Sequence, residues 1–370
     1  MGRKSLASAR GKATGKNARH AAHVKFMLEA IRLAERGIGK VSPNPMVGAV
    51  VVKGGKVVGR GWHGFFGGKH AEFNALEKAG KKAQGADLYV TLEPCNHHGK
   101  QPPCTKEILH AGIRRVFAAC PDPNKASKNG AKALRKAGVE TKFGLCRKEA
   151  EKQNEFYIKS VLSGRPFITI KTAMSSDGFI TYGDGRAKRI SGRKDFSYTQ
   201  ELRLRHDAIL VGVNTVLKDN PKLTYRRDKS LSPTRIVLDP RARTPPNARV
   251  VSQGGETLII CTRDAPRARA GRLAMKGAEI LVARSRAGRI DLRAMLASLH
   301  SLGIRSVLVE GGAFTASRFL EERLFDRLVI IIASMKIRKG LEAFKIGRRV
   351  RARIAETKKI GNDEVIVAEK

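Results

Sequence analysis

The sequence predicts an α/β protein built of two domains, and three observations support this. The chain has 370 residues, which at roughly 100–200 residues per domain corresponds to about two domains. Segments with helical spacing of apolar residues alternate with short apolar segments typical of strands, a pattern that favours mostly parallel sheets covered by helices. The run Ser163-Gly164-Arg165-Pro166 breaks a helical pattern, so we place the domain boundary there.

The first half alternates between helix and strand after an N-terminal helical pattern at Phe26–Arg36. The Gly54-Gly55 turn separates two expected strands, Val47–Val52 and Lys56–Val58. Further helices are expected at His70–Ala79, Thr105–Ala111, Ser127–Ala137 and Lys148–Val161, and further strands at Asp87–Leu92, Arg114–Ala118 and Val139–Phe143. Residues 26–162 therefore form the first predicted domain.

The second half, residues 163–370, repeats the alternation without copying the first half. Expected strands lie near Phe167–Thr172, Ala208–Val213, Arg235–Leu238, Leu258–Cys261, Glu279–Val282, Ser306–Glu310 and Arg327–Ala333. Helical patterns fall between them at Arg193–Arg205, Leu292–Leu302 and Thr315–Arg323. This half is also predicted to be α/β.

The chain is strongly basic, with 73 Lys and Arg against 33 Asp and Glu and a formal net charge of +40. Clustered cations neutralise phosphates, so the charge alone would suggest nucleic-acid binding. The excess is divided evenly, however, with 31 basic and 12 acidic residues in 1–160 and 42 and 21 in 161–370. An even excess is more typical of a solvated surface, and the few aromatic residues form no stacking ladder on a basic run. We therefore do not expect nucleic acid as a partner.

The N-terminal segment and the cysteines indicate the cellular compartment of the protein. Residues 1–25 are basic and acid-free and lack the apolar core of a signal peptide, which fits a transit peptide or a disordered tail; we expect the tail. No apolar stretch reaches the roughly 20 residues of a membrane span. The five cysteines, at positions 95, 104, 120, 146 and 261, are an odd and scattered set. This favours a reducing cytosol and leaves the thiols free for metal binding or chemistry.

Three segments of the first predicted domain together supply the ligands of a catalytic zinc site. His70 precedes Glu72 by two residues, Cys95 follows Pro94, and Cys104 follows a Pro-Pro pair. One imidazole and two thiolates leave the fourth tetrahedral position of Zn²⁺ to water, as in catalytic sites. Glu72 would carry protons between the water and the leaving group without being a ligand, as in zinc deaminases.

A zinc site at His70, Cys95 and Cys104 requires a particular helix start, and other residues could also supply the ligands. Residues i and i+2 do not share a face within a helix, so His70 and Glu72 serve one pocket only if they straddle a helix start. His97 and His98 are alternative imidazole ligands, and cysteines also occur as buried apolar residues. The combination of His-Ala-Glu at a helix start with Pro-Cys after a strand favours the zinc site.

The run TLEPCNHHGKQPPC, residues 91–104, resembles the cytidine-deaminase superfamily in the version found in riboflavin biosynthesis. Eight residues separate Cys95 from Cys104, whereas nucleic-acid deaminases of the superfamily usually place the cysteines two residues apart. The run PNPMVG, residues 43–48, matches the family's Pro-Asn-Pro-x-Val-Gly loop. The resemblance implies a cytidine-deaminase-like three-layer fold for residues 26–162 and a substrate contact by Asn44.

The second half of the chain contains no motif that by itself indicates one function. Gly311-Gly312, between an expected strand and helix, fits a phosphate site or a plain turn. Arg203, Arg205 and Arg226 could hold a phosphate or be surface charge. Four segments, however, are similar to the reductase domain of the riboflavin pathway: residues 164–166 (GRP), 171–178 (KTAMSSDG), 207–224 and 309–312 (VEGG). This resemblance implies a dihydrofolate-reductase-like α/β fold for residues 163–370 and NADPH as the cofactor.

From about residue 26 to 335 the chain thus resembles the bifunctional deaminase–reductases of riboflavin biosynthesis. The resemblance implies that Lys171 and Glu310 lie at the reducing centre with the ribose. It implies that Arg203, Leu223 and Arg226 hold the substrate, the arginines at its phosphate. It places the following residues at the NADPH site: Ala173, Arg189, Thr215, Asp219, Gly312, Ala313, Phe314, Thr315, Ala316, Ser317 and Arg318.

The second half also departs from the family pattern. Arg189-Ile190-Ser191 stands where the family usually has Trp-Ile-Thr/Ser beside the nicotinamide, and Ser334 stands where a proline is usual. Ser176 replaces the usual leucine before Asp177. Loss of the tryptophan ring would weaken the packing of the cofactor.

The predicted function is therefore a double one on a small phosphorylated pyrimidine. Zinc-dependent hydrolysis would remove the 2-amino group of 2,5-diamino-6-ribosylamino-4(3H)-pyrimidinone 5′-phosphate, and NADPH would then reduce the ribose of 5-amino-6-(5-phosphoribosylamino)uracil to ribityl. Two alternatives stay open: a deaminase with a degenerate reductase half, and a basic RNA-associated protein with relic sites. A homo-oligomer is compatible with all three.

Overall fold

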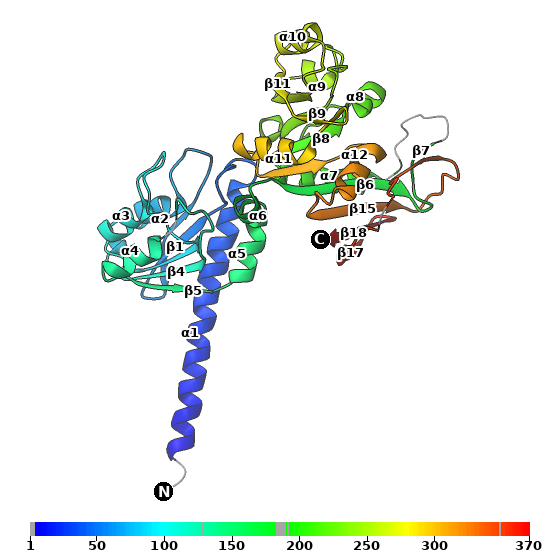
Figure 1. Cartoon of the computed structure of the whole chain (residues 1–370). Coiled ribbons are helices and arrows are strands. Elements are labelled where there is room, and N and C mark those ends of the chain that lie inside the picture. The colour runs from blue at the N-terminus through cyan, green and yellow to red at the C-terminus, as the bar shows by residue number, and fades with distance from the viewer. Residues whose placement is uncertain (1–3, 128, 183–189, 191, 348) are drawn as a thin grey trace. The chain divides into compact units, whose positions relative to one another are not determined.

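The computed structural model describes residues 4–370 except 128, 183–189, 191 and 348. It divides the chain into two compact units, Met1–Leu162 and Ser163–Lys370 (Figure 1). Each unit is an α/β structure with its own sheet, as the sequence predicts. None of the helices in the described part of the chain is both long and apolar enough to cross a membrane.

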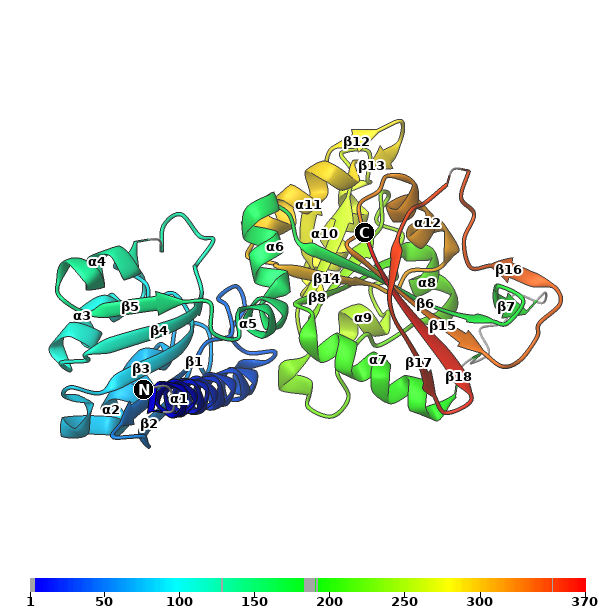
Figure 2. The same ribbon diagram turned by 90° about the horizontal axis from the view of Figure 1, so that it is seen from below.

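The sheet of the first unit has five strands in the order β2-β1-β3-β4-β5 (Figure 2). Strand β1 is antiparallel to β2 and β3, whereas β3, β4 and β5 are parallel. The strands are β1 (Gly48–Lys53), β2 (Lys56–Trp62), β3 (Asp87–Leu92), β4 (Arg115–Cys120) and β5 (Glu140–Phe143). All six residues of β3 are buried, as expected for a strand covered on both faces.

Helices cover both faces of this sheet and complete three layers. Helices α2 (Ala71–Ala79), α3 (Cys104–His110) and α4 (Gly130–Lys136) pack on one face through Ala75, Ile108 and Leu134. Helices α1 (Lys4–Ala34), α5 (Arg147–Gln153) and α6 (Glu155–Ser163) pack on the other. This confirms the three-layer fold that the resemblance implies.

The structure corrects two expectations for the helices of the first unit. Helix α1 begins at Lys4, so residues 4–25, which we expected to be a disordered tail, continue the helix expected from Phe26. These residues lack proline and are rich in Ala, Lys and Arg, which favour helix.

The single helix expected over Lys148–Val161 is two helices separated at Asn154. The Asn154 side chain accepts a hydrogen bond from the backbone N–H of Met46 and donates one to the carbonyl of Met46, both at 2.8 Å. This long-range pair ties the junction of α5 and α6 to the loop before β1.

Two glycines of β2 let helix α2 lie directly on the strand. A Cβ atom at Gly61 would lie 2.2 Å from the Ala71 carbonyl oxygen, and one at Gly59 would lie 2.2 Å from the Ala75 carbonyl oxygen. Any larger residue would push α2 away from the sheet. The position of α2 along its length therefore depends on these glycines, with Gly61 contacting its first turn and Gly59 its later turns.

The second unit contains a nine-stranded sheet in the order β11-β10-β9-β8-β14-β6-β15-β18-β17. The strands from β11 to β15 are parallel, and a C-terminal hairpin of β17 and β18 adds two antiparallel strands. The strands are β6 (Phe167–Ser175), β8 (Ala208–Gly212), β9 (Thr234–Leu238), β10 (Thr257–Cys261), β11 (Glu279–Val282), β14 (Ser306–Val309), β15 (Arg327–Ala333), β17 (Arg353–Ile360) and β18 (Asp363–Glu369). Two-stranded sheets are formed by β7 (Phe179–Tyr182) with β16 (Gly340–Glu342) and by β12 (Ser285–Arg286) with β13 (Arg289–Ile290).

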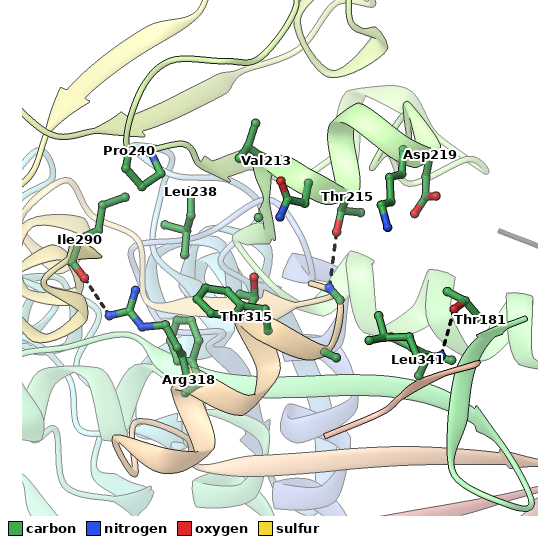
Figure 3. A pocket seen from close by; sticks show the side chains of 18 of the residues that line it. Thr181, Val213, Thr215, Asp219, Leu238, Pro240, Ile290, Thr315, Arg318 and Leu341 are labelled. Atoms are coloured by element: carbon green, nitrogen blue, oxygen red, sulfur yellow. Dashed lines mark hydrogen bonds between the residues drawn. The ribbon is translucent and has the colours of Figure 1, made fainter. Parts of the chain in front are cut away.

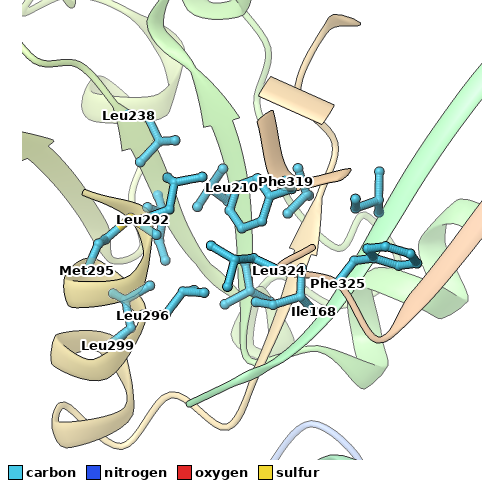
Figure 4. Close-up of a cluster of buried hydrophobic side chains, with 14 of the residues drawn as sticks. Ile168, Leu210, Leu238, Leu292, Met295, Leu296, Leu299, Phe319, Leu324 and Phe325 are labelled. Carbon is cyan, nitrogen blue, oxygen red and sulfur yellow. The ribbon is translucent and has the colours of Figure 1, made fainter. Parts of the chain in front are cut away.

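The main core of this unit lies between the sheet and helices α11 (Leu292–Ser301) and α12 (Ala313–Glu321). Figure 4 shows Met295, Leu296 and Leu299 of α11 pointing toward this cluster of buried side chains, with Phe319 of α12 on the other side. The other face is covered by α7 (Arg193–Arg205), α8 (Val213–Asp219), α9 (Arg249–Ser252) and α10 (Arg267–Met275). Strand residues therefore alternate between two apolar faces.

Sequence patterns missed several elements of this unit for identifiable reasons. Strand β17 lies at the sheet edge and its first five residues are exposed, so it lacks an apolar face. Strand β8 ends at Gly212, and Val213, which we assigned to the strand, begins α8 instead. A short apolar run does not by itself distinguish a strand end from a helix start.

We predict that Gly61→Ala destabilises the first unit by about 1–3 kcal/mol, because the added methyl group overlaps the backbone of α2. Urea denaturation followed by circular dichroism measures this change. Lys56→Ala, at an exposed position of the same strand, is the control and should change little. Equal stability of Gly61→Ala and the wild-type chain would contradict the proposed close packing.

Candidate active sites

Three predicted zinc ligands lie together in the first unit. The Nδ1 atom of His70 and the Sγ atoms of Cys95 and Cys104 lie within 4.8 Å of one another. His70 Nδ1 is 3.1 Å from Cys104 Sγ and 3.6 Å from Cys95 Sγ, and the two sulfur atoms are 3.5 Å apart. The structure thus brings together residues that are 25 and 34 positions apart in the chain.

Two helix starts and one strand end position these residues. His70 is the N-cap of α2 in an extended conformation, with φ −70° and ψ 163°, and α2 begins at Ala71. Glu72 lies in the first turn of α2 and is buried. Cys104 is the first residue of α3, and its backbone N–H donates to Cys95 Sγ at 3.4 Å. The condition that His70 and Glu72 straddle a helix start is therefore met.

The donor set fits a zinc ion. Zn–S bonds of about 2.3 Å and Zn–N bonds of about 2.0–2.1 Å place donors of a tetrahedral site roughly 3.6–3.8 Å apart. The observed separations of 3.1–3.6 Å are slightly shorter than this and need only small side-chain movements. Three protein ligands leave one coordination position open, which is typical of catalytic rather than structural zinc.

The local electrostatics favour a negative charge on one of the two sulfur atoms, because the pKa of Cys95 is lowered whereas that of Cys104 is raised by its hydrogen bond to Cys95 and by burial. Hydrogen bonding from Cys104 and His70 lowers the pKa of Cys95 to about 4, which favours the thiolate form of this sulfur. Its bond to His70 is in turn the main reason why the pKa of His70 is raised. Burial raises the pKa of Glu72 above its usual range. A carboxyl group that gains and loses a proton readily is suited to acid–base work.

His63 is a buried residue of this site that the sequence reasoning missed. Its Nδ1 lies 3.1 Å from the Lys69 carbonyl oxygen, its Nε2 lies 3.2 Å from Asn44 Nδ2, and its ring meets the His70 ring edge-on. Because a carbonyl oxygen can only accept, Nδ1 donates to it and Nε2 accepts from the Asn44 amide. His63 therefore orients the predicted substrate residue Asn44. The alternative ligands His97 and His98 are not members of the metal-binding group found among the described residues.

Four charged residues lie together in the second unit, and their side chains are at most 13% exposed. Arg203 of α7 donates to both carboxylate oxygens of Glu310, at 2.8 and 2.7 Å, and to the Thr224 carbonyl oxygen. Burial alone would raise the pKa of Glu310, but Arg203 and Lys171 lower it below its usual range. Lys171 Nζ lies 4.0 Å from Asp195, a residue that the sequence reasoning did not single out. The predicted reducing-centre residues Lys171 and Glu310 thus belong to one ionic cluster.

A cavity of about 800 Å³ lies at the carboxyl ends of parallel strands (Figure 3), and its lining includes Ala173 and Gly312, each two residues after a member of this cluster. Ligands of open α/β sheets bind at this edge. Gly312, the N-cap of α12, donates from its backbone N–H to Thr215 Oγ1 at 3.4 Å on one wall. A largely apolar wall with a helix N-terminus fits an extended cofactor that carries phosphates.

Most of the predicted cofactor residues line this cavity: Ala173, Thr215, Asp219, Gly312, Ala313, Phe314, Thr315 and Arg318. Two do not, because Ala316 is packed in the core and Ser317 accepts a hydrogen bond from the Lys345 N–H. Arg189 and Ser191 lie outside the described residues. The structure adds lining residues that no local motif marked: Ile180, Thr181, Arg243, Arg289 and Leu341.

The remaining predicted substrate residues differ in exposure. Leu223 has φ +52° and its side chain is buried in an apolar cluster, so only its backbone could face a ligand. Arg226 is exposed, and its guanidinium lies 4.8 Å from the centre of the Phe196 ring. Arg203 is committed to Glu310 and Thr224, whereas Arg226 is the more accessible cation for a phosphate.

Family comparisons agree with this division of the sites. Residues 20–120 match the model of the cytidine and deoxycytidylate deaminase zinc-binding region. Residues 166–366 match the model of the RibD C-terminal domain.

Similar proteins cover nearly the whole chain. The riboflavin biosynthesis protein RibD of Aquifex aeolicus is 40% identical over 348 residues, covering 92% of this chain and 96% of its own. The structure of Acinetobacter baumannii RibD is similar with a TM-score of 0.87 and 31% identity, covering 95% of this chain and 99% of its own. A Thermotoga maritima structure described as a diaminohydroxyphosphoribosylaminopyrimidine deaminase/5-amino-6-(5-phosphoribosylamino)uracil reductase has a TM-score of 0.85 and 35% identity, with the same coverage.

We predict that Cys104→Ser loses bound zinc, because a hydroxyl is a much weaker zinc ligand than a thiolate. Zinc per chain, measured on the purified protein by atomic emission, should fall from about one to near zero. Cys146→Ser is the matched control, since Cys146 lies outside the metal-binding group. Retention of a full equivalent of zinc by Cys104→Ser would contradict the assigned ligand set.

Proposed function

The chain belongs to the family of the riboflavin biosynthesis protein RibD, and from this premise we propose how its two units perform pyrimidine deamination and ribose reduction. It is a bifunctional enzyme of riboflavin biosynthesis, with deaminase and reductase activities on phosphoribosyl pyrimidine intermediates. The observation that carries the first half is the convergence of His70, Cys95 and Cys104 beside the buried Glu72. A cytosolic location remains a prediction.

In the first unit His70, Cys95 and Cys104 would hold Zn²⁺. When bound, the ion lowers the pKa of a water molecule and polarises it for attack on carbon. Glu72 would accept a proton from the attacking water and pass it to the departing amino group, so that a C2–O bond replaces the C2–N bond of the diaminopyrimidine and ammonia leaves. Asn44, oriented by His63, holds the pyrimidine. Burial of Glu72 keeps the proton transfer away from bulk water.

In the second unit the 800 Å³ cavity would hold NADPH, with its pyrophosphate at the N-terminus of α12. The nicotinamide supplies a hydride when the cofactor is bound. Lys171 and Glu310 lie with the ribose, where the Lys171 ammonium stabilises negative charge that develops on oxygen. Arg226 binds the 5′-phosphate of the substrate, and Arg203 holds Glu310 in an ionised, fixed position.

We predict that Glu72→Gln lowers ammonia release by about 100- to 10,000-fold, the usual range for loss of an acid–base group. Purified protein is given the diaminopyrimidine substrate, and ammonia is measured together with bound zinc. Zinc should stay at the wild-type level because Glu72 is not a ligand. Glu77→Gln, on the exposed face of the same helix, should retain wild-type turnover. Full ammonia release by Glu72→Gln would overturn the mechanism.

We predict that Lys171→Met lowers NADPH oxidation about 100-fold while ammonia release stays within about twofold. The deaminated pyrimidine is the substrate, and the loss of NADPH absorbance is the measurement. Lys276→Met, a change of an exposed lysine outside the cavity, is the control. No NADPH oxidation by the wild-type chain, with normal ammonia release, would instead favour a deaminase with a degenerate reductase unit.

A further inference from the structure

Asp195 is a buried carboxylate at the reducing centre that the proposed reaction has not used. It lies in the first turn of α7 and is only 4% exposed. Its Oδ2 lies 4.0 Å from Lys171 Nζ, and its Oδ1 accepts a hydrogen bond from the Thr199 hydroxyl at 3.4 Å. One oxygen therefore faces its own helix and the other faces Lys171.

The sheet register explains why Lys171 has this neighbour. Val309 of β14 pairs with Ile170 of β6, so Glu310 follows on β14 where Lys171 follows on β6. Side chains alternate along strands, and Leu308, two residues before Glu310, packs against Leu202 of α7. Lys171 and Glu310 thus share the face covered by α7, which also carries Asp195 and Arg203.

The four charged side chains of this cluster form two pairs of opposite charge. Both oxygens of Glu310 are engaged by Arg203, which fixes that carboxylate by two bonds. Asp195 supplies the second negative charge, beside the ammonium of Lys171. The cluster then holds two positive and two negative groups, which makes the burial of each charge tolerable.

A lysine side chain has a flexible four-carbon stem, so an ammonium at an active site needs a partner to hold it in one place. We propose that Asp195 is a positioning residue for the reductase: it holds the Lys171 ammonium at the ribose of the phosphoribosyl pyrimidine. At 4.0 Å the contact is longer than a hydrogen bond, so it orients Lys171 while leaving its N–H donors for the substrate. This inference rests on the proposed reductase function.

A simpler structural role for Asp195 makes a different prediction. A negative charge in the first turn of a helix stabilises the helix dipole wherever its side chain points. Asp195→Glu keeps that charge but moves the carboxylate by one methylene group. A dipole role therefore predicts that Asp195→Glu keeps the wild-type kcat for NADPH oxidation, whereas the positioning role predicts a lower kcat.

The experiment compares Asp195→Asn, Asp195→Glu and the control Glu201→Gln, an exposed acid of the same helix. We expect kcat for NADPH oxidation to fall at least about tenfold in Asp195→Asn and by an intermediate factor in Asp195→Glu. KM for NADPH should stay within about twofold, because the charge of Lys171 is not directed at the cofactor phosphates. Ammonia release by the same polypeptide and the unfolding temperature report whether the chain remains folded.

A second measurement does not depend on turnover. Lys171 is methylated reductively in the absence of nucleotide, and the rate is followed by peptide mass spectrometry. This rate should be at least about threefold faster in Asp195→Asn, because the amine loses the carboxylate that restrains it. The rate at the exposed Lys276 should not change.

The outcomes separate the inference from the reductase proposal. Wild-type protein without pyrimidine-dependent NADPH oxidation refutes the reductase function itself. If wild-type protein is active, then kcat within twofold of wild type in both Asp195 variants refutes the positioning role. A wild-type kcat in Asp195→Glu alone also refutes the positioning role, and so does an unchanged rate of methylation of Lys171 in Asp195→Asn. If Asp195→Asn fails to fold, the kcat of Asp195→Glu decides.

Discussion

The starts of helices are the feature on which both sites depend. The first turn of a helix carries backbone N–H donors without a partner inside the helix and a partial positive charge, which stabilise anionic groups placed there. His70 and Glu72 lie at the start of α2, Cys104 begins α3, and Gly312 precedes α12. In the first unit these starts surround the two cysteine sulfurs and the carboxyl group of Glu72. In the second unit the start of α12 borders the cavity that suits a phosphate-bearing cofactor.

Helix starts are useful only where the packing holds them in place. Gly59 and Gly61 let α2 lie on β2 closely enough to bring His70 to the end of β3. The His63 ring contacts the His70 ring and at the same time fixes the amide of Asn44. The proposed metal ligand His70, proton carrier Glu72 and substrate contact Asn44 are therefore positioned by the same few packing contacts.

The two units solve the problem of buried charge in different ways. The first unit gathers acidic groups, Cys95, Cys104 and Glu72, whose negative charge a cation held by His70, Cys95 and Cys104 would compensate. The second unit pairs its charges internally, with Arg203 on Glu310 and Lys171 near Asp195. Acids are also common among the other buried charged residues, whereas Arg235 is the one buried lysine or arginine in the described part of the chain. The surface is consequently even more basic than the composition suggests, which favours encounter with phosphorylated substrates.

The sequence by itself determined the two α/β halves, the candidate zinc residues His70, Cys95 and Cys104, and the family, because local periodicity and short motifs encode these directly; that His70 and Glu72 straddle a helix start was only a condition, which the structure met. It did not reveal Asp195, His63 or the lining residues Arg243 and Leu341, since no local pattern marks them. It also misplaced the start of α1 and missed the edge strand β17, where propensity and exposure outweigh apolar spacing. Only the tertiary structure decided that Arg203 of α7 binds Glu310, 107 positions away. Which residues of the sheet a covering helix meets depends on the order and register of the strands.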